Sequence, residues 1–489
     1  MNIRMLIEKG FSIAHIFDLF KNTHNIQHTK EGRFVIRKEQ YWKILPPVEY
    51  VEIIELRKFV ASESQGQLSP HTLAEVIKLL RTDPELEMDV EIENTGKIVF
   101  SNGVYDVEKQ CLEERINNDE YCWAIVNANY ISNCKIKDAP IFYEYVKSSL
   151  EFDINPDKAE LLLQILGYCL SDYIIAKKAF FFIGPPSCGK SIFLEFVRNL
   201  VDEEDTTQIP FSKSGDRFSK GVLRESRINI CGEMSEVGFP DIDAFKALTG
   251  GDTMFGERKG KDGFSYKPHV KLLNAGNVMP IPKKNDGTEA IMERMIFLVF
   301  SKSIPRECWN MHLVDNLLAE RDIICSLAVD RLKELVESNF QFCVPKDSAA
   351  YAKTYSESQN PLKVFLEEEC EINASKKELS TEMWERFTEF CKNNSFNRNV
   401  TMQVFSQTIA AFPGVVKVRE RVAEGQKTFF VGIGEKRINP KEDIGMHISN
   451  RKKAYPVLHN PPRLGKVGQK NVGENHNAQG GIYEQKNLH

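Results

Sequence analysis

The feature that most constrains this chain is a glycine-bounded loop between Gly184 and Ser191. Its eight residues, Gly-Pro-Pro-Ser-Cys-Gly-Lys-Ser, match the pattern G-x-x-x-x-G-K-[ST] at every fixed position. An apolar run at Ala179–Ile183, typical of a strand covered on both faces, comes directly before the loop. A helical apolar pattern begins at Ile192, directly after it. Strand, loop and helix in this order predict a phosphate-binding loop in an α/β domain.

The chemistry of the loop predicts how it would hold a nucleotide. Gly184 and Gly189 let the backbone curl so that successive N–H groups point at phosphate oxygens. Lys190 would neutralise charge on the β- and γ-phosphates, and the Ser191 hydroxyl would ligate Mg²⁺. The alternative is a glycine-rich turn that matches the pattern by chance. Cys188 lies inside the loop, and its thiol group is not expected to take part in nucleotide binding. We predict ATP and Mg²⁺ as cofactors, bound by Gly184, Pro185, Pro186, Ser187, Cys188, Gly189, Lys190 and Ser191.

A second predicted core strand, from Arg227 to Cys231, ends shortly before Glu233. An acidic residue at the end of a second core strand can polarise water and hold the metal shell. Glu233 is therefore the candidate general base and a candidate Mg²⁺ ligand. Glu236 is a second carboxylate nearby, for which a solvated position at the start of a helix is the alternative.

Two more polar residues flank apolar runs. Asn277 follows a run that begins at Val270, and its amide would sense the γ-phosphate or orient water; a structural Asx turn is the alternative. Arg294 directly precedes the run 295–300 and is a candidate arginine finger, with a surface ion pair as the alternative. The predicted catalytic set is Lys190, Glu233, Asn277 and Arg294.

A basic turn bounded by glycines lies between these blocks and contains Arg258, Lys259 and Lys261. Lysine and arginine side chains can track phosphates without reading sequence. The turn is therefore a candidate nucleic-acid contact, and a solvated loop is the alternative.

The length of 489 residues exceeds what one hydrophobic core supports and predicts several modules. Hydrophobic residues make up 42% and charged residues 27% of the chain, as in ordinary globular proteins. No apolar run approaches the ~20 residues of a membrane span and the N-terminus lacks a signal segment, so we expect a cytoplasmic protein without membrane contact.

The 11 cysteines contain no C-x-x-C pair, which predicts reduced thiols. With a net charge of −5, nucleic-acid binding requires a local basic lining.

Shifts in periodicity predict how the chain is divided. Residues 97–107 are predicted to form a hairpin around Asn102-Gly103, and helices are predicted within 139–170. Helical patterns at 362–371, 380–393 and 400–412 precede a hairpin, which is the pattern of a winged helix. The predicted segments are an N-terminal accessory region at 1–85, a mixed and helical domain at 86–170, a three-layer α/β ATPase domain at 171–335, a winged-helix domain at 360–436, and a basic disordered tail at 437–489.

Taken in order, these blocks resemble the superfamily III helicases, particularly the poxvirus and phage primase–helicase branch. The resemblance covers about 90–435 and rests on Asn102–Asp106, Gly167-Tyr168, Lys246–Asp252, Asn277–Pro280 and Arg294. It implies an AAA+-like P-loop motor that forms a hexameric ring. Such a ring would translocate on single-stranded DNA during replication of a virus, phage or mobile element, with Arg294 acting in trans.

The sequence departs from the family pattern at Gly232, where many members carry a second acidic residue. This leaves open whether Glu233, water or Ser191 alone holds the metal. The short N-terminal region contains no primase catalytic pattern, so priming activity is not expected. Host replication proteins are candidate partners.

The winged-helix pattern has two interpretations. Its third helix would enter a major groove and read an origin, with Arg398 and Gln403 near its front and Lys417 and Arg419 on the wing holding phosphates. A protein-contact module is the alternative. Two other classes also fit the loop: a winged-helix DNA-binding regulator switched by nucleotide without unwinding, and a P-loop kinase or metabolic ATPase.

Overall fold

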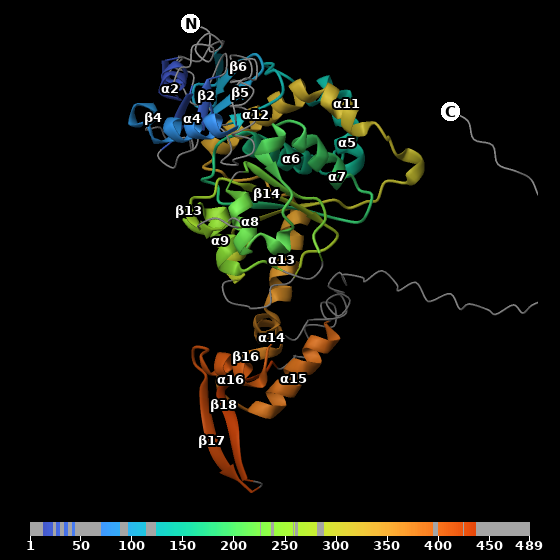
Figure 1. Ribbon diagram of the computed structural model, residues 1–489. Helices are drawn as coiled ribbons and strands as arrows, with labels where there is room; N and C mark the ends of the chain where they lie inside the picture. The colour runs from blue at the N-terminus through green and yellow to red at the C-terminus, as the bar shows by residue number, and fades with distance from the viewer. Residues whose placement is uncertain are drawn as a thin grey trace, which may run out of the picture. The chain divides into compact units, whose positions relative to one another are not determined.

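A computed structural model describes most of the chain, and Figure 1 traces it. Among the helices described, none is long and apolar enough to cross a bilayer. The predicted disordered tail lies outside the described residues, as do Arg258, Lys261, Arg398 and Glu236. The described residues are 13–22, 26–29, 34–37, 42–44, 70–88, 96–113, 124–224, 226–235, 239–257, 259, 263–280, 288–394, 400–423 and 425–436.

The described residues between 13 and 88 form a small sheet with the helices α2 and α4. The strands lie in the order β3-β2-β1-β4, and β4 is parallel to β1. Buried Phe34 and Val35 and the α4 residues Val76 and Leu80 provide apolar surface for this unit. Its elements are α2 (Ile13–Asn22), β1 (Ile26–Thr29), β2 (Phe34–Arg37), β3 (Trp42–Ile44), α4 (Pro70–Thr82), η1 (Pro84–Leu86) and β4 (Glu87–Met88).

A second small sheet has the order β7-β6-β5-β8 and contains the predicted hairpin. Strands β5 (Lys97–Phe100) and β6 (Gly103–Asp106) pair antiparallel around Asn102. Gly103 is required there because an added Cβ would lie 2.6 Å from the carbonyl oxygen of Glu113. The sheet is completed by β7 (Cys111–Glu113) and by β8 (Ala124–Ile125), which is parallel to β5.

The central sheet has five parallel strands in the order β10-β11-β14-β9-β15. Phe180, Phe181 and Phe182 of β9 are fully buried, and burial of each stabilises the fold by about 1.5–3 kcal/mol. The parallel α/β class predicted from the apolar runs is confirmed. The strands are β9 (Ala179–Ile183), β10 (Thr206–Thr207), β11 (Ile228–Cys231), β14 (Lys271–Gly276) and β15 (Met295–Val299).

Successive side chains of β9 enter two separate cores, so helices cover both faces of the sheet (Figure 1). Phe180 and Phe182 pack against one group of helices, and Phe181 packs in the second core. In the first layer α6 and α12 touch directly, since a Cβ on Gly167 would lie 2.2 Å from the Ala328 carbonyl oxygen. The first layer holds α5 (Pro140–Leu150), α6 (Pro156–Leu170), α7 (Lys190–Arg198), α11 (Leu313–Ala319) and α12 (Arg321–Glu337); the second holds α8 (Arg217–Leu223), α9 (Ile242–Gly250), α10 (Thr288–Met292) and α13 (Lys346–Gln359).

Short elements connect these layers. The antiparallel hairpin β12 (Met254–Gly256) and β13 (Phe264–Tyr266) flanks the predicted basic turn. The 3-10 turns are η2 (Ile136–Asp138), η3 (Glu203–Asp205), η4 (Phe211–Lys213) and η5 (Arg306–Cys308).

The described residues between 361 and 436 form three helices and a three-stranded antiparallel sheet around a core of their own, with the strands ordered β16-β18-β17. The predicted helix at 362–371 ends earlier, because Cys370 and Glu371 already pair with β18. The observed sheet therefore contains one strand, β16, in addition to the two strands of the predicted hairpin. The elements are α14 (Pro361–Glu369), β16 (Cys370–Leu379), α15 (Ser380–Asn393), α16 (Met402–Ala410), β17 (Val416–Val422) and β18 (Gly425–Glu435).

Candidate functional site

The glycine loop leaves β9 at the carboxyl edge of the central sheet. The Gly184 amide donates to the Gly276 carbonyl oxygen at 3.3 Å, which continues the pairing of β9 with β14 by one residue. A Cβ on Gly184 would lie 2.3 Å from the Phe300 carbonyl oxygen. Only glycine fits where the loop begins, because backbone rather than a movable side chain occupies that space.

The exit of the loop is held from α5. Ser187 and Gly189 have φ values of +59° and +99°, and Gly189 is the N-cap of α7. The Tyr145 hydroxyl donates to the Gly189 carbonyl oxygen at 3.2 Å, and burial raises the pKa of Tyr145, so this hydroxyl remains a donor. A Cβ on Gly189 would lie 2.5 Å from the Ser149 Oγ, a buried atom that has no hydrogen-bond partner among the described residues.

Lys190 lies across the curl of the loop and is only 8% exposed. Its Nζ donates to the carbonyl oxygens of Gly184 and Pro185 at 2.7 and 2.8 Å, and lies 3.3 Å from the Cys188 Sγ. The ammonium group is therefore positioned inside the loop, while the adjacent Ser191 at the start of α7 is exposed.

The segment after β15 supports the outer side of the loop, a contact that the sequence did not predict. The Ser303 Oγ donates to the Pro186 carbonyl oxygen at 2.8 Å, and the Ile304 amide donates to the Ser187 carbonyl oxygen at 2.8 Å. These two bonds fix the middle of the loop to the strand that begins after Arg294.

Glu233 and Asn277 lie at the same edge of the sheet as the loop. The register aligns Cys231 with Asn274 and Asn274 with Phe181, so Glu233 emerges level with Ile183 and Asn277 level with Gly184. With strands ~4.8 Å apart, their backbones lie about 10 and 5 Å from the loop strand. Both are exposed, and within the described part of the chain neither side chain has a hydrogen-bond partner.

Arg294 lies at the opposite edge of the sheet, one residue before β15. Its Nη1 donates to the Lys246 carbonyl oxygen and to the Thr249 Oγ1, both at 3.2 Å. A five-residue strand rising ~3.3 Å per residue separates this edge from the loop by roughly 16 Å. The structure thus brings Lys190, Glu233 and Asn277 to one edge and leaves Arg294 away from them.

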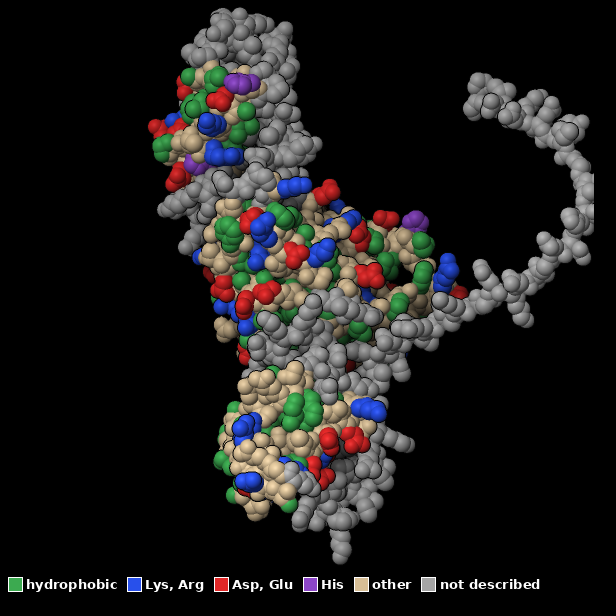
Figure 2. Space-filling view, turned by 60° about the horizontal axis from the view of Figure 1, so that its bottom comes forward, with side chains coloured by type: hydrophobic (Ala, Val, Ile, Leu, Met, Phe, Trp, Pro, Cys, Tyr) green, Lys and Arg blue, Asp and Glu red, His purple; other side chains and the backbone are tan. Residues whose placement is uncertain are grey.

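The hairpin of β12 and β13 presents an aromatic ring beside the basic turn. Phe255 is 55% exposed, and a Cβ on Gly263 would lie 2.1 Å from its ring, so glycine makes room for it. Lys259 is also exposed. Acidic and basic side chains are intermixed on the visible face in Figure 2, so local groups such as this one matter more than net charge.

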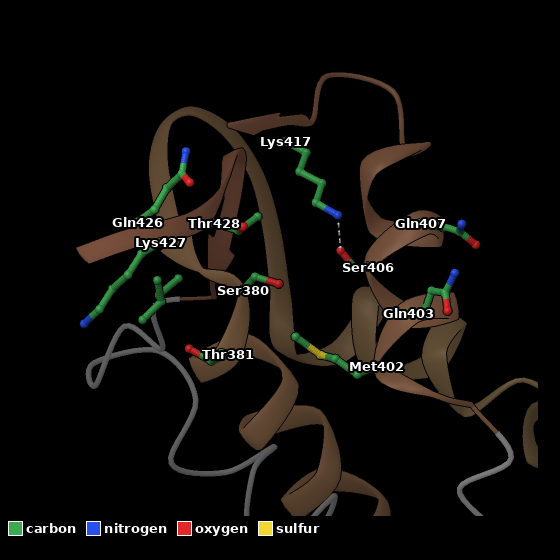
Figure 3. Close-up of a pocket in the computed structure, with 11 residues that line it drawn as sticks. Ser380, Thr381, Met402, Gln403, Ser406, Gln407, Lys417, Gln426, Lys427 and Thr428 are labelled. Carbon is green, nitrogen blue, oxygen red and sulfur yellow. Dashed lines mark hydrogen bonds between the residues drawn. The ribbon is translucent and has the colours of Figure 1, made fainter. Parts of the chain in front are cut away.

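Two of the C-terminal candidates, Gln403 and Lys417, line a hollow of about 820 Å³ (Figure 3). Gln403 is exposed on α16, and Lys417 of β17 donates from its Nζ to the Ser406 Oγ of α16 at 2.7 Å. Arg419 is exposed two residues further along β17.

A buried lysine near the loop was also missed by the sequence reasoning. Lys158 is fully buried at the start of α6, and its Nζ lies 2.6 Å from Asp347, 2.9 Å from the Ser301 Oγ and 3.7 Å from Glu151. Glu151 also pairs with Lys302 at 2.7 Å, which holds down the pKa of that carboxyl. The only signal in the sequence is the Asn155-Pro156 helix start, which does not distinguish a buried lysine from a solvated one.

Comparisons with known proteins give three findings. A family model described as a family of unknown function (DUF5906) matches residues 182–294. A protein of Acanthamoeba polyphaga mimivirus, "Putative helicase L207/L206", is 26% identical over 227 residues, which cover 44% of this chain. The chain spans 23% of that relative's length. Two apo structures of the NrS-1 C-terminal region match at 12% and 11% identity, each with a TM-score of 0.43 over 86% of this chain and 98% of the other.

Proposed function

We propose that this chain is an ATP-dependent DNA helicase of the superfamily III type, which translocates on single-stranded DNA during replication of a phage or mobile element. The observation that carries the proposal is the buried ammonium group of Lys190 inside a two-glycine loop, with Glu233 and Asn277 at the same sheet edge. The similarity to a viral protein named as a helicase supports it.

The residues present fit a nucleoside triphosphate with Mg²⁺. Gly184 and Gly189 leave space that a Cβ would fill, and loop and helix N–H groups suit phosphate oxygens. Lys190 would exchange its bonds to loop carbonyl groups for bonds to the β- and γ-phosphates. Ser191 and Glu233 are the exposed oxygen donors that would hold Mg²⁺, which supplies charge neutralisation at the phosphates when bound.

The strand order supports a division of labour at this edge. Strand β14 separates β9 from β11, so Glu233 is about 10 Å from the loop strand. That gap suits a γ-phosphate and the water that attacks it, with Glu233 accepting the proton and Asn277 orienting the water. Glu233 is available for this role because no described residue pairs with it.

Arg294 is proposed to act on the nucleotide of a neighbouring subunit. Its distance from the loop of its own chain, roughly 16 Å along β9, exceeds what one side chain spans. An arginine that completes a site in trans requires a closed head-to-tail assembly, and we propose a hexameric ring of the AAA+-like kind.

Single-stranded DNA is proposed to contact the hairpin of β12 and β13. An exposed aromatic ring, Phe255, next to a basic turn suits stacking on a base combined with phosphate contacts. Lys259 belongs to this contact, and Arg258 and Lys261 are proposed with it from the sequence alone.

We propose that 171–335 is the motor, preceded by accessory regions at 1–85 and 86–170, and that 360–436 is a winged-helix DNA-binding unit. The α14, α15, α16 order followed by the β17–β18 hairpin supports that assignment. Gln403, Lys417 and Arg419 are its proposed DNA contacts.

ATP hydrolysis with and without single-stranded DNA, measured beside unwinding of a forked duplex, tests the function. We expect hydrolysis that single-stranded DNA stimulates, and unwinding that Lys190→Ala abolishes. Lys353→Ala, which removes an exposed lysine of α13, should change neither rate. Slow hydrolysis indifferent to DNA, with no unwinding, would instead indicate a nucleotide-switched winged-helix regulator.

A further inference from the structure

The exposed surface of α16 carries no charge. Gln403, Val404, Gln407, Thr408 and Ala411, which caps the helix, are all exposed, and Val404 is 49% exposed. The Thr408 Oγ1 donates to the Val404 carbonyl oxygen at 2.9 Å, so this hydroxyl is engaged within the helix. The helix thus presents the amides of Gln403 and Gln407 one turn apart (Figure 3), with exposed Val404 and Thr408 next to them in the sequence.

Cations flank this neutral helix from the neighbouring hairpin. Alternation along β17 places Lys417, Arg419 and Arg421 on one face, and Lys417 reaches α16 by its bond to Ser406. All three are exposed, and no described residue forms an ion pair with Arg419 or Arg421. The opposite face carries Glu420, which is neutralised by Lys377 at 2.5 Å.

The hollow between α16, the hairpin and the start of α15 contains no acidic side chain. Ser380, 4% exposed, and Thr381 bring hydroxyl groups to it, and Gln426 and Lys427 lie across it from Gln403 (Figure 3). Its lining residues are Leu379, Ser380, Thr381, Met402, Gln403, Ser406, Gln407, Lys417, Gln426, Lys427 and Thr428. A site of cations, amides and hydroxyls without acids suits a polyanion better than a protein surface.

We propose that α16 enters the major groove of double-stranded DNA and selects A·T base pairs. A glutamine amide can bond adenine at two edge positions, and the exposed side chains of Val404 and Thr408, which carry methyl groups, suit the thymine methyl group. Guanine is read mainly by arginine or lysine, and α16 has neither. Arg419, Arg421 and Lys417 hold the backbone phosphates and contribute no base selection.

Duplex rather than single-stranded DNA fits the shape of this surface. A helix of nine residues is about 14 Å long and 10–12 Å wide, which matches a major groove of ~12 Å. Binding of single strands depends on exposed rings on which bases stack. Phe405 of α16 is buried, and a single exposed ring, Phe412 just beyond the helix end, offers little surface for successive bases among the described residues of this face. This inference refines the DNA-binding part of the proposed function.

The test is selection of sites from a random duplex pool by the full chain without nucleotide, followed by affinity measurements on the selected duplex and a G·C-only duplex. We expect an A·T-containing motif. Gln403→Ala and Gln407→Ala should each weaken binding to the selected duplex about 5- to 100-fold and leave the G·C duplex unchanged. Arg419→Ala should weaken both duplexes equally and reduce the slope of log affinity against log salt by about one.

Lys392→Ala is the matched control for charge, because it removes a lysine near the far end of α15 from the hollow. It should change neither selectivity nor the salt slope, and circular dichroism checks that each variant is folded. Equal affinity for A·T and G·C duplexes, or glutamine variants that bind like wild type, would overturn the inference.

The same measurements separate this inference from the motor. If the protein hydrolyses ATP on single strands but shows no A·T selection, this inference is wrong and the proposed motor function stands. If it selects A·T duplexes without hydrolysing ATP, the proposed motor function is wrong and this inference stands. Running the binding assays in a Lys190→Ala background removes any contribution of hydrolysis.

Discussion

The carbonyl oxygen of Arg294 accepts a hydrogen bond from the amide of Ala179 at 2.8 Å, at the first residue of β9. The glycine loop begins where that same strand ends, at Gly184. An arginine and a phosphate loop at opposite ends of one strand cannot meet on one nucleotide. In the proposed ring they would meet where two copies of the chain adjoin.

This arrangement predicts complementation between two inactive variants. Arg294→Ala should lower ATP hydrolysis about 10³-fold or more, as loss of an arginine finger does, and Lys190→Ala should abolish it. Rings assembled from a 1:1 mixture, purified through a different tag on each variant, should recover about a quarter of the wild-type rate, because an intact loop then meets an intact arginine at some interfaces. No recovery, with both variants folded, would mean that Arg294 acts only within its own chain.

Alanine at the loop glycines should be far less tolerated than alanine beside the candidate base. Gly184→Ala places a Cβ 2.3 Å from a backbone oxygen, and Gly189→Ala adds a clash with Ser149 to a positive φ of +99°. We expect both to destabilise the fold by about 1–3 kcal/mol and to lose nucleotide binding. Gly232→Ala meets nothing within 4 Å and should melt like wild type. Thermal melting with and without an ATP analogue measures this, and a normal melting temperature for Gly184→Ala would contradict it.

The buried ion pair of Lys158 should matter for stability where an exposed pair does not. Lys158→Met leaves Asp347 without the ammonium group 2.6 Å away and should lower the free energy of unfolding by about 3 kcal/mol. Lys147→Met breaks a 3.7 Å pair with Asp153 in which both side chains are exposed, and should change it by less than about 1 kcal/mol. Urea unfolding followed by circular dichroism compares the two; similar losses would show that burial is not the cause.

We predict that Lys271 makes the free energy of unfolding increase with pH in the alkaline range. Burial, and then the nearby Arg227, lower the pKa of Lys271 to about 8, although its Nζ donates to the Ser171 carbonyl oxygen and faces the Tyr168 ring. Between this value and the ordinary 10.5, the unfolded chain holds a proton that the folded chain has lost. The free energy of unfolding therefore rises with pH across that window.

Lys271→Met isolates the effect, because other groups titrate in both proteins. Relative to the variant, wild type should gain at most about 3 kcal/mol between pH 8 and 10.5, measured by urea unfolding at several pH values. A constant difference between the two proteins over this range would show that Lys271 does not lose its proton on folding.

The loop and its strand could be predicted because their signals are local. Ala179–Ile183 is apolar at every position, the glycines and Lys190 have fixed spacing, and the ends of β11 and β14 follow from their apolar runs. Once the strands are parallel, their carboxyl ends share an edge, which brings Glu233 and Asn277 to the loop.

The contacts that hold the loop could not be predicted, because they join residues far apart in the sequence. Ser303 and Tyr145 look like ordinary surface and helix residues until packing places them against the loop. Strand β16 was missed for a related reason. Its sequence from Asn373 to Lys377 is polar and has no alternation, and it becomes a strand through pairing with β18 across an irregular register.

Strand β15 links two places that belong to different sites. Arg294 precedes its first residue, and Ser303 and Ile304, just beyond its end, grip the carbonyl groups of Pro186 and Ser187. Residues 295–299 are paired with β9, and the Phe300 amide extends the pairing to Ile183, so only Ser301 and Lys302 lie between the paired strand and the residues that hold the loop. In the proposed ring, contact between Arg294 and the adjoining copy's nucleotide would be coupled through β15 to the carbonyl groups of Pro186 and Ser187, so the catalytic state of one copy would affect the glycine loop of the next.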